Sequence, residues 1–153
     1  STCGPSTTVN SSPMTVNTVG TSTGTIYYPL TSYWHDGRTQ MLFLKSELNA
    51  AGITGGTFKA LALYVATKSS TIPFNGFTIK MGCTSLTSLT SLQSGLTTVY
   101  GPVSYSSTAG SWNTFNLTTQ YNWDNVSNLL VEICYDNTCE FLPLHFFAKF
   151  LAL

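Results

Sequence analysis

Charged residues are scarce in this chain. They make up 8% of its 153 residues, with six Lys and Arg against six Asp and Glu, so the formal net charge is zero. Globular proteins usually contain about 25% charged residues. A neutral chain with so few basic groups has no patch that could follow phosphates, which argues against nucleic acid and against anionic membranes as partners.

Histidines and catalytic motifs are equally scarce. Only His35 and His145 occur and no GxSxG motif is present, so the sequence gives little support for a hydrolase triad. A glycosidase would need two carboxylates about 5 to 10 Å apart in a cleft, whereas we interpret Glu132, Asp136 and Asn137 as turn residues. We therefore predict a protein that is not an enzyme, with no catalytic residue and no cofactor.

The chain also lacks long apolar runs and a dedicated metal loop. No run of about 18 apolar residues exists, which argues against a spanning helix. Without an N-terminal Met or a basic-then-apolar signal, we expect a mature product or a piece of a longer chain. Calcium held by Asp124, Asp136 and backbone carbonyls is the one metal site to consider, because hard cations prefer oxygen ligands.

Ser, Thr and Asn take the place of the charges. These residues keep a surface hydrated and favour strands or turns over helices. The chain is also 42% hydrophobic and 13% aromatic, which gives enough apolar surface to offset chain entropy. At 153 residues we expect one folded, strand-rich domain.

The four cysteines indicate the compartment. Cys3, Cys83, Cys134 and Cys139 are even in number and lack metal-like CxxC spacing, so we predict disulfides and an extracellular or periplasmic location. Three pairings are open. A Cys134–Cys139 bond would staple a local hairpin, whereas Cys83–Cys134 would close a longer loop. We favour the second. Cys134 lies two residues after Glu132, so in a regular strand both side chains point to the same face, which counts against this pairing unless a β-bulge intervenes.

Sequence periodicity predicts several strands and one helix. Residues 57–67 are apolar on both faces, which predicts a central strand, with Phe58, Ala60, Ala62, Tyr64 and Ala66 sharing one of the faces. Residues 77–83 alternate, which predicts one face in the core and one in water. Residues 96–100 and 103–105 predict two short strands around Gly101–Pro102. Residues 45–52 predict a short helix that Ser46 caps, Glu47 supports in its first turn and Gly52 ends.

The stretch from Trp112 to Tyr135 organises the fold. Its pattern predicts a strand, a turn at residues 121–125 and a second strand at residues 129–134, which form the most strand-like run in the chain. Residues 84–94 repeat Thr-Ser-Leu, which suggests either a threonine ladder for binding ice or a low-complexity connection. The repeat is too short for a solenoid, and we favour the connection.

Several blocks of the chain carry a family resemblance. They are Tyr33, residues 38–53, 74–84, 95–101, 112–115, 121–124 and 127–134. In this order the blocks resemble the β-sandwich modules of secreted Bacteroidetes proteins, which are exported by the type IX route. Such modules often stand beside fibronectin type III or PKD-like domains, sometimes on proteases or adhesins. The resemblance covers about Gly24 to Asn137 and implies a secreted, jelly-roll-like, non-catalytic module whose ligand is generally unassigned.

We therefore predict an all-β fold, an antiparallel, jelly-roll-like β-sandwich with one short helix near 46–51. Residues 1–23 form an N-terminal leader with an edge strand around 14–19, residues 24–138 the sandwich, and residues 139–153 an apolar tail. Glycosylation acceptor patterns at Asn10, Asn116 and Asn125 matter only if the source glycosylates Asn.

The apolar tail departs from the module pattern after Asn137. Left exposed, it would be a surface for association. Three interpretations are open: a last core strand, a segment that packs into a neighbouring subunit by β-augmentation, or an altered or foreign C-terminus. The second interpretation predicts a homo-oligomer or filament, assembled through Phe141, Leu142, Leu144, Phe146, Phe147, Phe150 and Leu151.

Two functions fit these features. The first is a structural or adhesive module on the cell surface that associates with itself or with neighbouring domains. The second is a carbohydrate-binding module, in which aromatic rings stack on sugars while Asn and Asp bond hydroxyls. The rings considered for stacking are Tyr27, Tyr28, Tyr33 and Trp34, or Trp112, Tyr121 and Trp123. The alternative for these rings is packing at the edges of the sandwich, which we favour.

Overall fold

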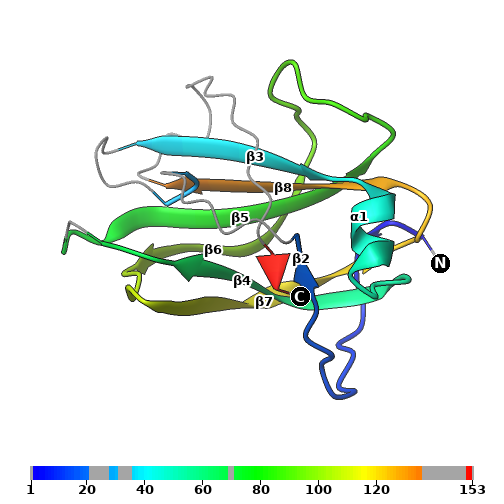
Figure 1. Ribbon diagram of the computed structural model, residues 1–153, viewed down its shortest axis with the longest axis horizontal. Helices are drawn as coiled ribbons and strands as arrows, with labels where there is room; N and C mark the ends of the chain where they lie inside the picture. The colour runs from blue at the N-terminus through cyan, green and yellow to red at the C-terminus, as the bar shows by residue number, and fades with distance from the viewer. Residues whose placement is uncertain (1, 21–27, 31–35, 69–70, 136–150, 153) are drawn as a thin grey trace.

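The computed structural model describes residues 2–20, 28–30, 36–68, 71–135 and 151–152, and its strands form two antiparallel sheets (Figure 1). One sheet has the order β3-β8-β5-β6, and the other the order β1-β7-β4-β9-β2. The strands are β1 (Gly4–Pro5), β2 (Thr18–Val19), β3 (Gly37–Phe43), β4 (Gly56–Val65), β5 (Phe74–Thr84), β6 (Thr97–Tyr105), β7 (Ser111–Trp123), β8 (Asn128–Tyr135) and β9 (Leu151–Ala152).

The chain crosses between the sheets at almost every step from β3 to β8. Among the described strands, β5 and β6 are the only successive ones that pair with each other. Strands β7 and β8 lie in different sheets, so the turn between them is an arch. This alternation is what a jelly-roll-like sandwich requires. The predicted all-β antiparallel sandwich is confirmed.

Aromatic rings join the two sheets in the core. Phe77 of β5 stacks on Phe115 of β7 across the sandwich, with ring centroids 5.1 Å apart, and Tyr105 packs 4.9 Å from Phe77. The Tyr105 hydroxyl donates a hydrogen bond to Asn113 Oδ1 at 2.5 Å. Burial, with Tyr100 nearby, raises the pKa of Tyr105 to about 12.

Strand β4 is central, as predicted, but its two faces are divided differently. A register shift separates Phe58, which pairs with Tyr121, from Ala60, which pairs with Asn116. Phe58 therefore packs in the core with Leu61 and Leu63, whereas Tyr64 lies 51% exposed on the outer face. The prediction that Phe58 and Tyr64 share one face is wrong, because the irregularity shifts the two-residue period of the strand.

The short helix is α1 (Lys45–Ala50), which covers one end of the sandwich (Figure 1). Its N-cap is Leu44 rather than the predicted Ser46, and Glu47 Oε2 accepts the backbone N–H of Leu44 at 3.0 Å. Gly52, with φ of 87°, ends the helix as predicted. The N–H groups of Gly52 and Ile53 bond the carbonyls of Asn49 and Leu48, which forms a Schellman motif.

Strand β6 runs unbroken through Gly101–Pro102, where two separate strands had been predicted. Gly101 has φ of 78°, and a Cβ there would lie 2.1 Å from the carbonyl oxygen of Phe77 on β5. The close approach of two backbones and the left-handed conformation both require glycine.

Replacing Gly101 by Ala is expected to lower the free energy of unfolding by about 2 to 3 kcal/mol, because the added methyl is both conformationally strained and in contact with backbone. Urea denaturation measures the loss. Gly95→Ala is a matched control, because Gly95 has a similar φ of 76° but nothing lies within 4 Å of the position that an added Cβ would take. Equal losses for the two variants would contradict the importance of the Phe77 contact.

The Thr-Ser-Leu segment is a connection without strand structure, and it packs on the outer face of the four-stranded sheet. Gln93 donates its backbone N–H to Gln40 Oε1 at 2.8 Å, and Leu96 lies against Gly82. The prediction that one face of β5 lies in water is therefore wrong. Thr78 is 6% exposed, and Gly82 is buried beneath this connection. An ice-binding threonine ladder would need a regular strand array, which this segment does not form.

Both ends of the chain contribute short strands to the five-stranded sheet. In the leader, β1 pairs with β7, and β2 is the predicted edge strand in a shorter form. In the tail, β9 lies between β2 and β4, where Leu151 pairs with Val19 and Ala152 with Ala62. This pairing within the chain is what the closing-strand interpretation expects. The other predicted assembly residues, Phe141, Leu142, Leu144, Phe146, Phe147 and Phe150, lie outside the described residues.

Candidate functional site

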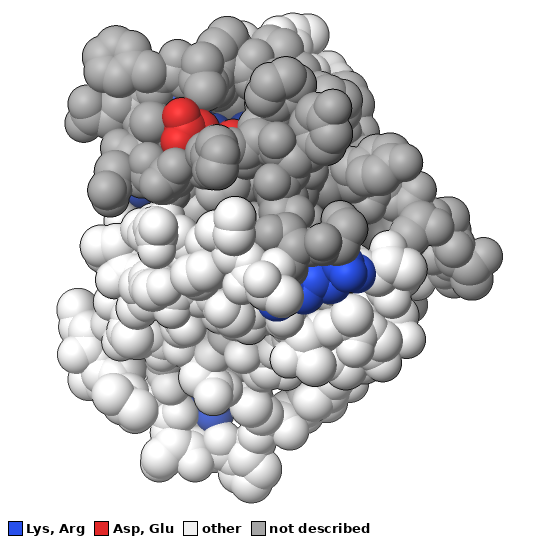
Figure 2. Space-filling model, turned by 90° about the vertical axis from the view of Figure 1, so that its left-hand side faces the viewer, with Lys and Arg blue, Asp and Glu red and all other residues white. Residues whose placement is uncertain are grey.

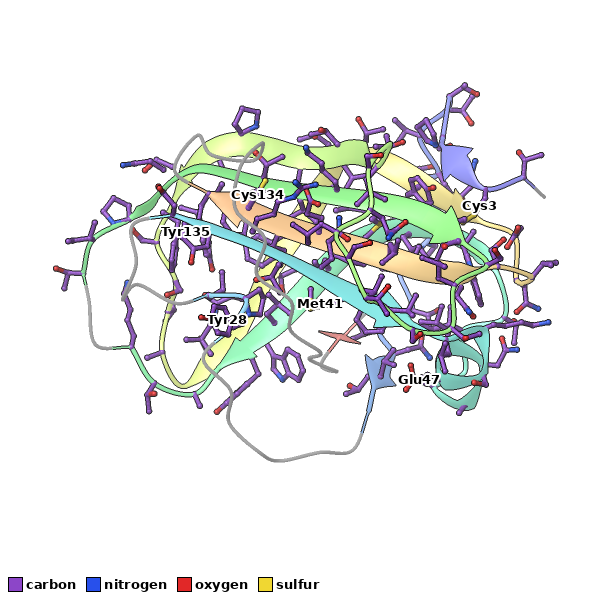
Figure 3. All side chains as sticks on the ribbon, turned by 90° about the horizontal axis from the view of Figure 1, so that it is seen from above. Cys3, Tyr28, Met41, Glu47, Cys134 and Tyr135 are labelled. Atoms are coloured by element: carbon purple, nitrogen blue, oxygen red, sulfur yellow. A yellow bond between two sulfur atoms is a disulfide. The ribbon has the colours of Figure 1, made fainter. Side chains whose placement is uncertain are left out.

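A disulfide ties the leader to the four-stranded sheet. It joins Cys3 to Cys83 at the end of β5, with Cα atoms 6.2 Å apart. The favoured Cys83–Cys134 pairing is wrong, because antiparallel register places Cys83 opposite Leu129 and Cys134 opposite Thr78. Figure 3 shows Cys3 and Cys134 well apart along the sheet. Cys134 is also disulfide-bonded, and Cys139 lies outside the described residues.

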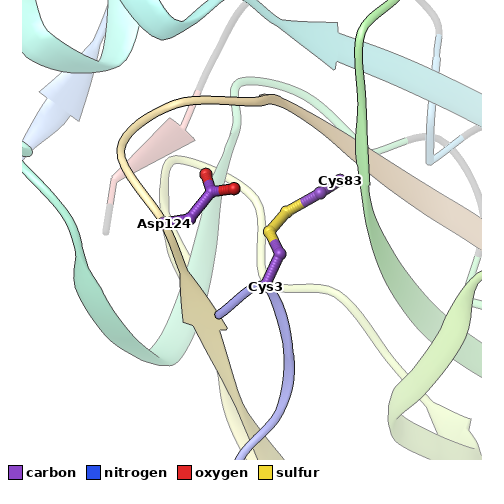
Figure 4. A group of neighbouring side chains, drawn as sticks. All are labelled: Cys3, Cys83 and Asp124. Atoms are coloured by element: carbon purple, nitrogen blue, oxygen red, sulfur yellow. A yellow bond between two sulfur atoms is a disulfide. The ribbon is translucent and has the colours of Figure 1, made fainter. Parts of the chain in front are cut away.

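A cavity of about 330 Å³ lies beside this disulfide, lined in part by Tyr121, Gln93 and Leu96. Asp124 is close enough that its carboxylate and the two sulfur atoms lie within 4.8 Å of one another (Figure 4). The sulfur atoms are bonded to each other and are therefore not thiolate ligands. Burial raises the pKa of Tyr121. A backbone hydrogen bond with Cys83 opposes this rise, and the charge of Asp124 makes a smaller contribution that also raises the pKa.

Asp124 itself holds the arch between β7 and β8. Its Oδ1 accepts the backbone N–H groups of Val126 and Ser127, and its Oδ2 accepts the Ser127 hydroxyl, each at 2.9 Å. These bonds, led by the Ser127 N–H, lower the pKa of Asp124. The carboxylate thus has a structural role in the arch. Asp136, its proposed partner in a calcium site, lies outside the described residues.

Asp124→Asn is expected to lower the free energy of unfolding by about 1 kcal/mol at pH 6, because the carboxylate accepts stronger hydrogen bonds than an amide. A folded-state pKa below the ordinary value of 3.8 means that this stability is complete above pH 3.8 and is lost as the pH falls through the folded-state pKa. Urea denaturation at pH 6 and pH 3 measures both proteins. A difference that stays constant between the two pH values would contradict this account.

A buried carboxylate lies on the outer face of the four-stranded sheet. Glu132 of β8 is fully buried, and its Oε2 accepts hydrogen bonds from Arg38 Nε at 2.9 Å and Gln40 Nε2 at 2.6 Å. Its Oε1 accepts no hydrogen bond in the described part of the chain, and Lys80 Nζ lies 3.7 Å away. Gln40 Nε2 also donates to the carbonyl of Gln93 at 2.7 Å. The prediction of Glu132 as a turn residue is wrong, because it is in mid-strand.

Two of the predicted sugar-stacking residues are in the core. Tyr121 is 4% exposed and Trp123 is fully buried, with its indole N–H donating to the carbonyl of Ser127 at 3.0 Å. They are therefore corrected from surface rings to core rings, in line with the packing alternative. Tyr27, Tyr33 and Trp34 lie outside the described residues, and Tyr28 is half-buried.

The third predicted stacking residue, Trp112, is on the surface and has an aromatic partner. It is 44% exposed and lies directly opposite Tyr64 across β4 and β7. The ring centroids are 5.6 Å apart, with an interplanar angle of 72°. Among the described residues, these are the only aromatic side chains that are largely exposed, and we call them the aromatic pair. Trp112 was predicted as a site residue, whereas Tyr64 was missed because it was assigned to an apolar strand face.

Comparison of the chain with protein-family models, curated proteins and solved structures gives no match. None of the described helices is both long and apolar enough to cross a membrane. The candidate site is accordingly defined by its geometry alone, as the outer face of β4 and β7 around the aromatic pair.

Proposed function

We propose that the chain is a non-catalytic structural or adhesive module that works outside the cytoplasm, as the resemblance to secreted surface modules also suggests. Its main support comes from three carboxylates that have structural roles. Glu47 caps α1, Asp124 holds the arch and Glu132 is paired inside the sheet. None of these three residues is left as a free acid or base facing a cleft.

The cross-link and the sparse charge support the same proposal. The Cys3–Cys83 disulfide is stable in an oxidising compartment, where small extracellular domains commonly use such bonds. On the face drawn in Figure 2, Lys, Arg, Asp and Glu atoms occupy only small, separate areas. Adhesion by this module would therefore rely on uncharged contacts, with little dependence on salt.

Adhesion and catalysis are tested side by side on the full-length chain. Beads coated with the protein are expected to adhere to surfaces bearing polysaccharide or glycoprotein, with similar retention in 50 and 500 mM NaCl. Nitrophenyl glycosides, nitrophenyl esters and casein are expected to remain uncleaved. Turnover of any of these substrates, or a lack of both adhesion and self-association, would overturn the proposal.

Self-association through residues 139–153 is a separate part of the proposal, supported by the apolar composition of the tail. Light scattering and negative-stain imaging of the full chain over a range of concentrations measure it. Assemblies that disappear when Phe146, Phe147 and Phe150 are replaced by Ser would support a structural polymer. A monomer at every concentration would leave adhesion as the function, provided that circular dichroism shows a folded sandwich.

A further inference from the structure

The outer face of β4 and β7 carries an uncharged strip next to the aromatic pair. Thr114 and Asn116 follow Trp112 on β7, are exposed, and lie opposite Ala62 and Ala60 of β4. At about 3.4 Å per residue, Trp112 to Asn116 span about 14 Å. The strip therefore has rings at one end and hydrogen-bonding side chains along its length.

The polar side chains of this strip are free to bind. No hydrogen bond involves the Thr114 hydroxyl or the Asn116 amide within the described chain, whereas the next outward hydroxyl, that of Thr118, donates to the carbonyl of Val99 at 3.1 Å. Thr118 therefore marks the end of the strip. The opposing alanines, Ala60 and Ala62, are each only 7% exposed, so the open part of the strip lies on β7.

The chemistry of this strip matches one class of ligand. Aromatic faces pack against the C–H face of a pyranose, while hydroxyl and amide groups bond its hydroxyls. A nucleic acid would need cationic side chains, which the strip lacks. A stable protein partner would need about 800 Å² of complementary surface per partner, and two rings among polar side chains do not provide an apolar centre of that size.

We propose that the strip of Tyr64, Trp112, Thr114 and Asn116 is a binding site for a neutral oligosaccharide. Because the two rings meet at 72°, a sugar ring can lie flat on only one of them. Trp112 has the larger face and is the stacking residue. Tyr64 supports the indole edge to face and adds a hydroxyl at the same end of the site. The proposal rests on the adhesive function and names its ligand class.

The test uses the full-length protein and four neutral probes, which are cellohexaose, xylohexaose, mannohexaose and maltohexaose. Isothermal titration is expected to detect binding of at least one of them, with heparin and polygalacturonate unbound. Binding should also protect tryptophan fluorescence from acrylamide in the native protein but not in Trp112→Ala, because Trp112 is exposed. No heat and no protection with any neutral probe at 5 mM would overturn the proposal.

Variants assign the binding to this strip. Trp112→Ala and Tyr64→Ala are expected to weaken binding about tenfold or more, as truncation of a central contact residue does. Asn116→Ala should weaken it about threefold. Val126→Ala is the matched control, because Val126 is 74% exposed at the distant arch. Full affinity in a folded Trp112→Ala protein would overturn the site.

The outcomes also separate this proposal from the adhesive function. If the coated beads adhere but no neutral sugar binds, the sugar site fails and the adhesive function stands. If a sugar binds and is then cleaved, the site stands and the non-catalytic function fails. An unchanged bead retention for Trp112→Ala, together with weakened sugar binding, would show that adhesion uses another surface, which would overturn the role of the strip in adhesion.

Discussion

Replacing Glu132 by Ala is expected to lower the free energy of unfolding by about 3 kcal/mol. The carboxylate is fully buried between Arg38 and Lys80, whose side chains are only 16% and 25% exposed. Without it, two cations are left without their partner in a largely buried layer. Their partial exposure reduces the loss from the larger values of completely buried pairs. The melting temperature should fall by about 6 to 12 °C, which calorimetry measures.

A triple variant separates the loss of pairing from the loss of packing. Arg38→Met, Lys80→Met and Glu132→Leu together replace the charges by apolar side chains of similar volume, and such exchanges are often neutral. This protein is expected to be more stable than Glu132→Ala. Two results would contradict a stabilising role of the ion pairs. One is a loss of less than about 1 kcal/mol in the free energy of unfolding of Glu132→Ala, and the other is a triple variant that is less stable than Glu132→Ala.

Removing the Cys3–Cys83 disulfide is expected to cost about 4 kcal/mol, because the bond spans a sequence separation of 80 residues and restricts the unfolded chain over that length. The double variant Cys3→Ser, Cys83→Ser should melt about 8 to 16 °C below the native protein. Loss of the cross-link should also expose the leader, whose β1 pairs with β7 at only two positions. Limited proteolysis is then expected to cut the leader before the sandwich.

Substitution is better than a reducing agent for this test, because Cys134 is also disulfide-bonded. Adding reductant to the double variant gives the contribution of that second bond, and the melting temperature should fall further. A double variant that melts within about 2 °C of the native protein would contradict the entropic account.

Strands and turns could be predicted wherever the local pattern is regular. The alternation of residues 77–83 identified the core face of β5, and Gly52 marked the end of α1, because both signals lie within a few neighbouring residues. The outer face of β5 could not be predicted in this way. There Leu96 lies over Gly82, and the connection that precedes Leu96 is held to β3 by Gln93, which accepts a hydrogen bond from Gln40 across 53 residues of sequence.

The site was harder to predict for similar reasons. Glu132 bonds Gln40 and Arg38, which are 92 and 94 residues away in sequence, so no local pattern indicates that a strand glutamate is buried. Tyr64 lies on the outer face because the backbone is irregular between Phe58 and Ala60, and no sequence pattern indicates this irregularity. Trp123 next to Asp124 looks like an exposed turn aromatic, yet its indole ring closes the core beneath the arch.

The cross-link between Cys3 and Cys83 also determines how the module would respond to mechanical force. If the chain is pulled by its two ends, tension passes from Cys3 directly to Cys83 through the sulfur atoms. The residues between the two cysteines add no length, and at most residues 84–153 can be drawn out, less the loop that the second disulfide at Cys134 closes. At about 3.4 Å per residue, the extension is limited to about 240 Å instead of about 520 Å for the whole chain. A tether built from such modules would extend less under force, and β3, β4 and β5 would stay within a covalently closed loop.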